Sequence, residues 1–179
     1  MTSRSSVEGD ERLRLFLALR LPEDWLDAIV AWQERAFAGA RVRVVPREHL
    51  HVTLVFLGST PAGELPAVVE RLERAARPVE LRPLGYRETR AAAMLTFEDV
   101  GGHGEAFADA AGRDEGRPWL PHVTVARYRE RPKLQEEFPV TIRTHVLVPS
   151  DAAAYLSRLR PSGAEYEVLA LSALTARYA

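Results

Sequence analysis

The sequence predicts an α+β fold: a two-lobed single domain with pseudo-two-fold symmetry, mostly antiparallel sheets lining a central cleft, and helices on the outside. Three observations predict it. Apolar runs of strand length outnumber the helical patterns and alternate with them. One pattern, His-Val-Thr followed by an aliphatic residue, occurs once in each half of the chain, inside an apolar run each time. Short linkers join the elements, which argues against two independent domains.

Apolar periodicity and proline place the elements of the first half. Pro22 follows an apolar run of strand length and supplies the fixed φ that suits the first turn of a helix. Apolar residues then recur at helical spacing, and Glu23 and Asp24 complement the positive end of the helix dipole. The Ser59-Thr60-Pro61 stop precedes a second helix, which ends before Pro78. We expect strands at 13–21, 41–45 and 50–58, and a first helix at 23–37.

The second half is predicted to consist mainly of strands. Apolar runs predict strands at 79–87, 91–100, 119–128, 140–148, 155–159 and 166–174, and a Pro161-Ser162-Gly163 turn joins the last two. The glycine-rich stretch 101–116 carries only a weak apolar stripe, so any helix there is short. Residues 1–11 are polar and aperiodic. We expect them to form a flexible N-terminal tail before a single bilobal domain at 12–179.

The composition limits the classes of partner and site. The formal net charge is −1, so a polyanion needs a local patch; all but one of the 24 basic residues are Arg, which suits bidentate phosphate contacts. The absence of cysteine excludes disulfides, thiol nucleophiles and thiolate metal sites, and fits a cytoplasmic protein. No run approaches the roughly 20 apolar residues that cross a bilayer, so we expect no membrane span.

The repeated motif has a clear geometric meaning in a strand. Side chains alternate between the two faces, so His51 and Thr53 point one way while their neighbours point the other, and the same holds for His122 and Thr124. Each strand thus buries one face and offers an imidazole and a hydroxyl on the other. If the two strands lie side by side, two imidazoles meet across one cleft, which suits acid–base catalysis on a phosphate ester.

The histidines could also have other roles. A single histidine such as His51 would most simply be a satisfied residue of a sheet, but the second copy favours a site. His49 and His51 also form a His-x-His pair that could bind zinc, although Thr53 and Val55 follow where a carboxylate would be needed. We therefore expect no metal and no other cofactor. His103 and His145 lack a motif and are interpreted as surface or loop residues.

At these residues the chain resembles a known family. The pair HVTL at 51–54 and HVTV at 122–125 resembles the twin HxTx motifs of the 2H phosphoesterase superfamily, in particular the bacterial and archaeal RNA 2′,3′-cyclic phosphodiesterases once called 2′–5′ RNA ligases. The resemblance extends over roughly residues 12–171. Further matching phrases are RLFLAL at 14–19 with Pro22, LHVTLVFLG at 50–58, RPWLPH at 117–122, and SRL at 157–159 with Gly163 and Tyr166. The segment 101–116 departs from the family in being shorter and richer in glycine.

The resemblance implies the chemistry. It assigns His51 as the proton donor to the departing 3′ oxygen and His122 as the proton acceptor that activates water, so that a 2′,3′-cyclic phosphate opens to a 2′-phosphate without a metal. Thr53 and Thr124 lie two residues on and on the same strand face, where their hydroxyls can hydrogen-bond the non-bridging phosphate oxygens.

Residues that flank the second motif are candidates for binding substrate. Arg127 and Arg117 could each neutralise a phosphate, although strict alternation puts Arg127 on the face opposite His122. Trp119, Phe56 and Tyr166 could stack on a terminal base, although alternation turns Phe56 to the buried face.

The expected partner is an RNA end that bears a 2′,3′-cyclic phosphate. We expect no membrane and no obligate protein partner, and a chain that acts as a monomer. Two alternatives stay open. The same two histidines would serve a phosphodiesterase acting on cyclic nucleotides or 2′–5′ linked oligonucleotides, and an RNA-end binding protein without turnover belongs to a different class.

Overall fold

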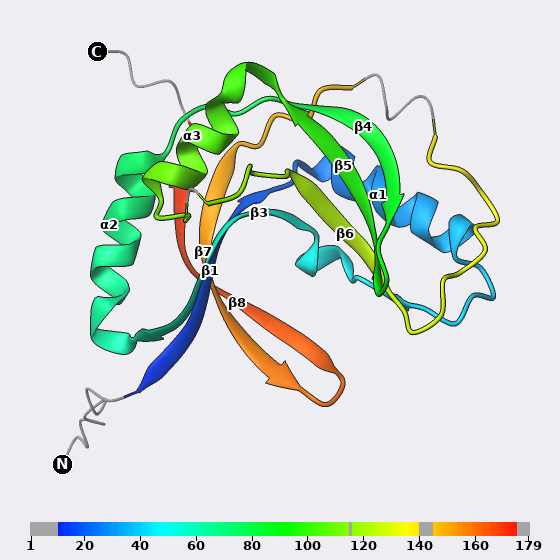
Figure 1. Cartoon of the computed structure of the whole chain (residues 1–179), viewed down its shortest axis with the longest axis horizontal. Helices are drawn as coiled ribbons and strands as arrows, with labels where there is room; N and C mark the ends of the chain where they lie inside the picture. The colour runs from blue at the N-terminus through cyan, green and yellow to red at the C-terminus, as the bar shows by residue number, and fades with distance from the viewer. Residues whose placement is uncertain (1–10, 115, 140–144, 175–179) are drawn as a thin grey trace.

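A computed structural model of the chain describes residues 11–114, 116–139 and 145–174 (Figure 1). Within them, eight strands form one sheet in the order β4-β5-β6-β3-β1-β7-β8, with β2 paired to β6, and all the paired strands are antiparallel. The strands are β1 (Arg12–Arg20), β2 (Arg43–Val44), β3 (His51–Pro61), β4 (Leu81–Glu88), β5 (Ala92–Asp99), β6 (His122–Arg127), β7 (Asp151–Arg160) and β8 (Gly163–Ala173). The helices are α1 (Glu23–Ala36), α2 (Leu65–Ala75) and α3 (His103–Ala110), with short 3₁₀ turns at Arg47–His49, Ala62–Glu64 and Val100–Gly102.

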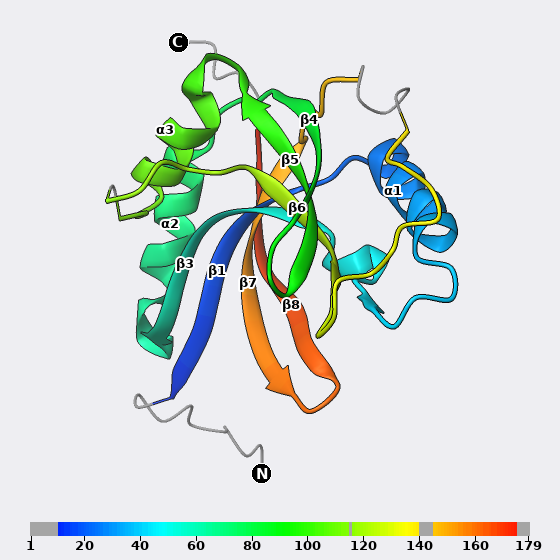
Figure 2. The ribbon, with the colours of Figure 1, turned by 45° about the vertical axis from the view of Figure 1, so that its right-hand side comes forward.

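The sheet is strongly curled, and the helices lie around it. Figures 1 and 2 show α2 and α3 together at one side and α1 at the other, while the tip of the β7–β8 hairpin projects away from all three helices. α2 contacts β7, β8 and α3, and α3 contacts β3 and β5. The α+β class and the antiparallel pairing are therefore confirmed. One sheet runs through both halves of the chain.

Helix α1 forms as the sequence predicts. Pro22 precedes it with φ −59°, Glu23 and Asp24 occupy its first turn, and Arg35 lies in its last turn. Its buried face carries Trp25, Ile29 and Trp32 into the main hydrophobic core. None of the helices in the described residues is both long and apolar enough to span a membrane.

Several predicted strands differ from the observed ones at their ends. The 41–45 strand shortens to Arg43–Val44, with a bend at Arg41 before it, and the 119–128 strand starts only at His122. For the predicted strand at 140–148, residues 140–144 lie outside the described residues; the rest forms only the bridge between Leu147 and Leu81. The predicted tail is likewise outside the described residues except for Glu11, and the helix in 101–116 is short, as expected.

Candidate active site

The two motif strands, β3 and β6, are neighbours at the centre of the sheet. They pair antiparallel through Val52 and Val123, both fully buried. This register places His51 across from Thr124 and Thr53 across from His122, so each imidazole lies beside the threonine of the other motif. All four side chains line one cleft with a volume of about 570 Å³. The arrangement expected from the sequence, two imidazoles facing one cleft, is present.

Both imidazoles are held in the same way. His51 Nδ1 lies 2.7 Å from His49 O, and His122 Nδ1 lies 2.8 Å from Leu120 O, so each ring bonds the carbonyl two residues before it. A carbonyl oxygen can only accept, so Nδ1 carries the proton in both rings. Nε2 is then the nitrogen that can gain or lose a proton. In the neutral ring of His51, Nε2 accepts from the Thr53 hydroxyl at 3.1 Å.

A β-bulge follows each motif at the same position. The ladder of β3 with β1 skips Leu54, and the ladder of β6 with β5 skips Val125, each the third residue after its histidine. The skipped residue and the next one are both buried, which resets the alternation of faces. Phe56 and Arg127 consequently return to the side of the histidines and line the cleft. The same bulge in both halves supports the predicted pseudo-two-fold symmetry.

Strict alternation therefore predicts the wrong face for two residues. Phe56 was expected to be buried, yet its side chain is 70% exposed. Arg127 was expected to point away from His122, yet it lines the same cleft. The physical reason is the same for both: one inserted residue turns every later side chain of a strand to the opposite face.

A buried glutamine supports the bulge in β6. Gln33 of α1 is only 2% exposed, and its Nε2 donates to Val125 O at 2.8 Å and to Val45 O at 3.1 Å. Val45 N donates to the same Val125 carbonyl at 2.9 Å. The side-chain amide thus ties α1 to the bulge that turns Arg127 into the cleft. The 41–45 alternation did not reveal this contact, because its donor lies on a distant helix.

We expect Gln33→Met to destabilise the fold. The substitution keeps the volume but leaves Val45 O without its donor, and an orphaned buried carbonyl costs about 1–3 kcal/mol. Urea unfolding measures the change. The exposed Gln135, whose Nε2 bonds Lys133 O at 3.4 Å, provides the matched control, and Gln135→Met should change stability by less than about 0.5 kcal/mol. Equal losses in the two variants would contradict the role given to Gln33.

Aromatic rings surround the first catalytic candidate. The ring centroid of His51 lies 5.0 Å from Phe16, 5.9 Å from Tyr155 and 5.6 Å from Tyr166. Burial among these rings lowers the pKa of His51 from 6.5 to about 4; its bond to His49 O opposes the shift, and positive charge on His122 adds to it. In the protein without substrate, His51 is therefore neutral near pH 7.

This shift predicts a pH dependence of stability. The folded-state pKa of His51 lies below its unfolded value, so between pH 6.5 and about 4 the unfolded chain binds more protons. Stability must then fall as the pH falls through this window, by up to roughly 3 kcal/mol from this one group. Denaturant titrations at several pH values should show that His51→Gln removes this loss, while the exposed His103→Gln keeps it. A pH dependence unchanged by His51→Gln would refute the inference.

Neither Arg117 nor Trp119, both predicted to bind substrate, lines the cleft. The indole Nε1 of Trp119 donates to Thr53 O at 3.0 Å, and the ring packs so closely on α3 that a Cβ at Gly104 would lie 2.2 Å from it. Trp119 thus connects the backbone of the first motif to α3 and to the segment that leads into the second motif. The backbone carbonyl of Arg117 accepts from Arg113.

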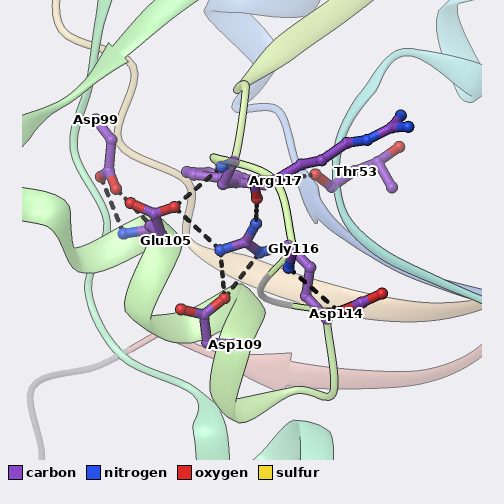
Figure 3. A network of polar contacts seen from close by, with 10 residues as sticks. Thr53, Asp99, Glu105, Asp109, Asp114, Gly116 and Arg117 are labelled. Atoms are coloured by element: carbon purple, nitrogen blue, oxygen red, sulfur yellow. Dashed lines mark hydrogen bonds and ion pairs between the residues drawn. The ribbon is translucent and has the colours of Figure 1, made fainter.

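A network of ion pairs and hydrogen bonds holds Trp119 in place (Figure 3). Asp99 accepts from the backbone N–H groups of Gly104 and Glu105 at 2.9 and 2.8 Å and so caps α3. The Glu105 carboxylate accepts from Trp119 N and from Arg113, both at 3.0 Å. In sequence, RPWLPH gives no sign of these partners, because they lie on the preceding strand, helix and loop.

Arg43 is a cleft residue that sequence reasoning missed. It sits opposite Arg127 in the β2–β6 pair, and its Nη1 donates to Ser162 O in the β7–β8 turn at 2.9 Å. The turn approaches so closely that a Cβ at Gly163 would lie 2.3 Å from that nitrogen. The alternation of 41–45 placed Arg43 in a strand but could not show which surface the strand faces.

The His-x-His pair, considered above as an alternative zinc site, gains no further ligand. Within 11–114, 116–139 and 145–174, no three His, Cys, Asp or Glu side chains gather as a metal-binding group. The ring of His49 instead contacts Tyr166, with centroids 4.7 Å apart, and both line the cleft.

Comparisons with known proteins agree with this geometry. Residues 19–91 match the sequence model of a family described as LigT like Phosphoesterase. The RNA 2′,3′-cyclic phosphodiesterase of Thermus thermophilus is 32% identical over 88% of either chain. The enzyme of the same name from Methanocaldococcus jannaschii is 24% identical, over 88% of this chain and 98% of its own. A crystal structure of TT0787 from Thermus thermophilus superposes with a TM-score of 0.70 at 28% identity, covering 93% of this chain and 100% of that one. The chain therefore belongs to the LigT-like phosphoesterases, a family of the 2H phosphoesterase superfamily.

Proposed function

We propose that the protein hydrolyses the 2′,3′-cyclic phosphate at the end of an RNA strand to a 2′-phosphate. The observation that carries the proposal is the antiparallel pairing of the two motifs, which presents two imidazoles to one cleft with Nδ1 of each ring already bonded. Relatives that bear the name of this activity support it. Because two side chains supply acid and base, the reaction needs no metal ion.

In the proposed reaction the two imidazoles act on opposite sides of the phosphorus. His122 Nε2 takes a proton from water as the water oxygen bonds to phosphorus. The bond from phosphorus to the 3′ oxygen breaks, and His51 Nε2 donates its proton to that oxygen. The products are a 2′-phosphate and a free 3′ hydroxyl. Each histidine ends in the protonation state of the other, and exchange with solvent restores both.

The donor role requires that substrate binding protonates His51. Its pKa of about 4 leaves the free imidazole neutral near pH 7. The cyclic phosphate is an anion, and an anion beside the ring favours the charged imidazolium. We therefore propose that His51 gains its proton only when the phosphate occupies the cleft, at the point where the Thr53 hydroxyl now bonds Nε2.

Arg127 and the two threonines are proposed to hold the phosphate. Within the described residues Arg127 makes no ion pair, so its guanidinium is available for a bidentate contact with the non-bridging oxygens. Thr53 lies on β3 and Thr124 on β6, and both line the cleft. Their hydroxyls can donate hydrogen bonds to the same oxygens as negative charge develops on them.

We further propose that the chain acts as a monomer, because both histidines, both threonines and Arg127 come from one chain. We propose that it acts in the cytoplasm, which the absence of cysteine fits.

The proposal is tested with an oligoribonucleotide that ends in a 2′,3′-cyclic phosphate, incubated in the presence of a chelator. We expect a 2′-phosphate product, identified by phosphorus NMR. No conversion by the wild-type protein would reject the enzymatic function, and binding without turnover would then favour an RNA-end binding protein. A 3′-phosphate product would instead reverse the donor and acceptor assignments.

A further inference from the structure

A second hollow of about 420 Å³ adjoins the cleft. It lies between β1–β3 and the projecting end of the β7–β8 hairpin, and we call it the side groove. Arg14, Leu159 and Arg160 line the side groove but not the cleft, whereas Phe56, Arg127 and Tyr166 line both. The two hollows therefore share a wall. A molecule held in the cleft can continue into the side groove without leaving the surface.

The side groove is positively charged in a chain whose net charge is −1. Four guanidinium groups line it, and no carboxylate does. Arg14, which is exposed, and Arg127 form no ion pair with any described residue, and Arg43 bonds only a backbone carbonyl. Arg160 pairs with Glu165 at 3.1 Å. Unpaired guanidinium groups in such a setting are suited to backbone phosphates.

The side groove also offers an exposed aromatic ring. Phe56 is 70% exposed, with its ring centroid 5.7 Å from the buried Phe16, which supports it from below. Leu159, which is 68% exposed, adds apolar surface on the hairpin. An aromatic ring beside guanidinium groups is the combination that binds single-stranded nucleic acid, because bases stack while phosphates pair.

A neighbouring hollow, which shares Arg43 and Arg127 with the cleft, fits a strand less well. Four arginines line it too, but Glu130 lies among them, and the one aromatic residue of its lining, Tyr128, is only 7% exposed. That surface offers charge without a stacking platform. The side groove offers both.

We propose that the side groove binds the nucleotides immediately 5′ of the cyclic phosphate, with Arg14 on a phosphate between them and Phe56 under a base. The proposal rests on the proposed function and narrows its substrate: the protein acts on the end of an RNA strand in preference to a free cyclic nucleotide. Arg14 then contributes to the preference for a longer RNA over a single cyclic nucleotide and takes no part in the chemistry.

The test compares two substrates across matched variants. One is a nucleoside 2′,3′-cyclic monophosphate, and the other is a trinucleotide ending in the same cyclic nucleotide. We expect wild-type kcat/KM to be at least about tenfold higher for the trinucleotide, given about 1–3 kcal/mol per stacked base. Arg14→Gln should lower the trinucleotide value roughly fivefold, as expected for about 1 kcal/mol from one charge pair, and leave the mononucleotide value unchanged. Arg14→Glu should lower it further.

Two exposed arginines provide the controls. Arg41→Gln makes the same charge change in the neighbouring hollow, where Arg41 lines neither the cleft nor the side groove, and Arg158→Gln makes it on the hairpin, where Arg158 pairs with Glu167 outside the side groove. Neither should alter the preference for the trinucleotide. A length-dependent loss in Arg41→Gln, an unaffected Arg14→Gln, or equal losses on both substrates would each overturn the proposal. So would equal wild-type efficiency on the two substrates, which leaves the proposed function intact. Hydrolysis of neither would refute the function and this inference together.

Discussion

We expect His51→Ala and His122→Ala each to lower kcat for cyclic phosphate hydrolysis by about 10²–10⁴-fold, the usual contribution of general acid–base catalysis. Both rings have Nδ1 bonded to a backbone carbonyl and line the same cleft, which leaves Nε2 of each for proton transfer. Steady-state kinetics on a trinucleotide substrate provide the measurement. The double variant should lose less than the product of the two single losses, because groups that act as a unit are not additive.

The two variants should differ in their response to pH. Hydroxide can replace a missing general base, so the residual activity of His122→Ala should rise as the pH increases. His51→Ala lacks the acid, which hydroxide cannot replace, so its residual activity should show no such rise. His103→Ala changes a histidine at the start of α3, outside the cleft, and should keep full activity. A rise with pH in His51→Ala alone would show that the roles are reversed.

Thr53→Val and Thr124→Val should each lower kcat by about 10²-fold, with a smaller change in KM. Valine keeps the shape and the strand preference of threonine but removes the hydroxyl, and losing one preorganised donor to a developing oxyanion costs about 10²–10³-fold. The loss falls on kcat because the hydroxyls bond the phosphate most strongly in the transition state. The register of β3 and β6 places one threonine beside each imidazole.

Thr60→Val on the same strand provides the control. Thr60 lies at the far end of β3, away from the cleft, and the same substitution there should leave kcat unchanged. An equal rise in KM for all three variants, with kcat unaltered, would contradict a role for the hydroxyls in the transition state. Wild-type rates for Thr53→Val and Thr124→Val would contradict it as well.

The local sequence pattern was sufficient to predict most strands and helices and the two histidines and two threonines of the site. The alternation of apolar and polar residues within each HVT triplet holds in the structure, because Val52 and Val123 are buried and the four flanking side chains face the cleft. Pro22 likewise precedes α1, and α2 lies between Pro61 and Pro78, as expected. These features depend on neighbours within a few residues, so a single sequence records them.

Contacts between distant segments could not be predicted. The bulges at Leu54 and Val125 exist because of the ladders to β1 and β5, so Phe56 and Arg127 were given the wrong face. Trp119 was expected to stack on a base, but α3 supplies the carboxylate that fixes its backbone in a different role. Arg14 begins the RLFLAL phrase, but only the folded hairpin shows that it lines a groove beside the cleft.

The central claim, that two imidazoles flank one phosphorus, is tested most directly by a crystal structure with a nucleoside 2′,3′-cyclic vanadate, which mimics the five-coordinate phosphorus of the transition state. We predict that the two apical oxygens of the vanadate lie within hydrogen-bond distance of His51 Nε2 and His122 Nε2, one on each side, with Arg127 and the threonine hydroxyls on the equatorial oxygens. A vanadate bound outside the cleft, or one that both imidazoles contact from the same side, would contradict the mechanism.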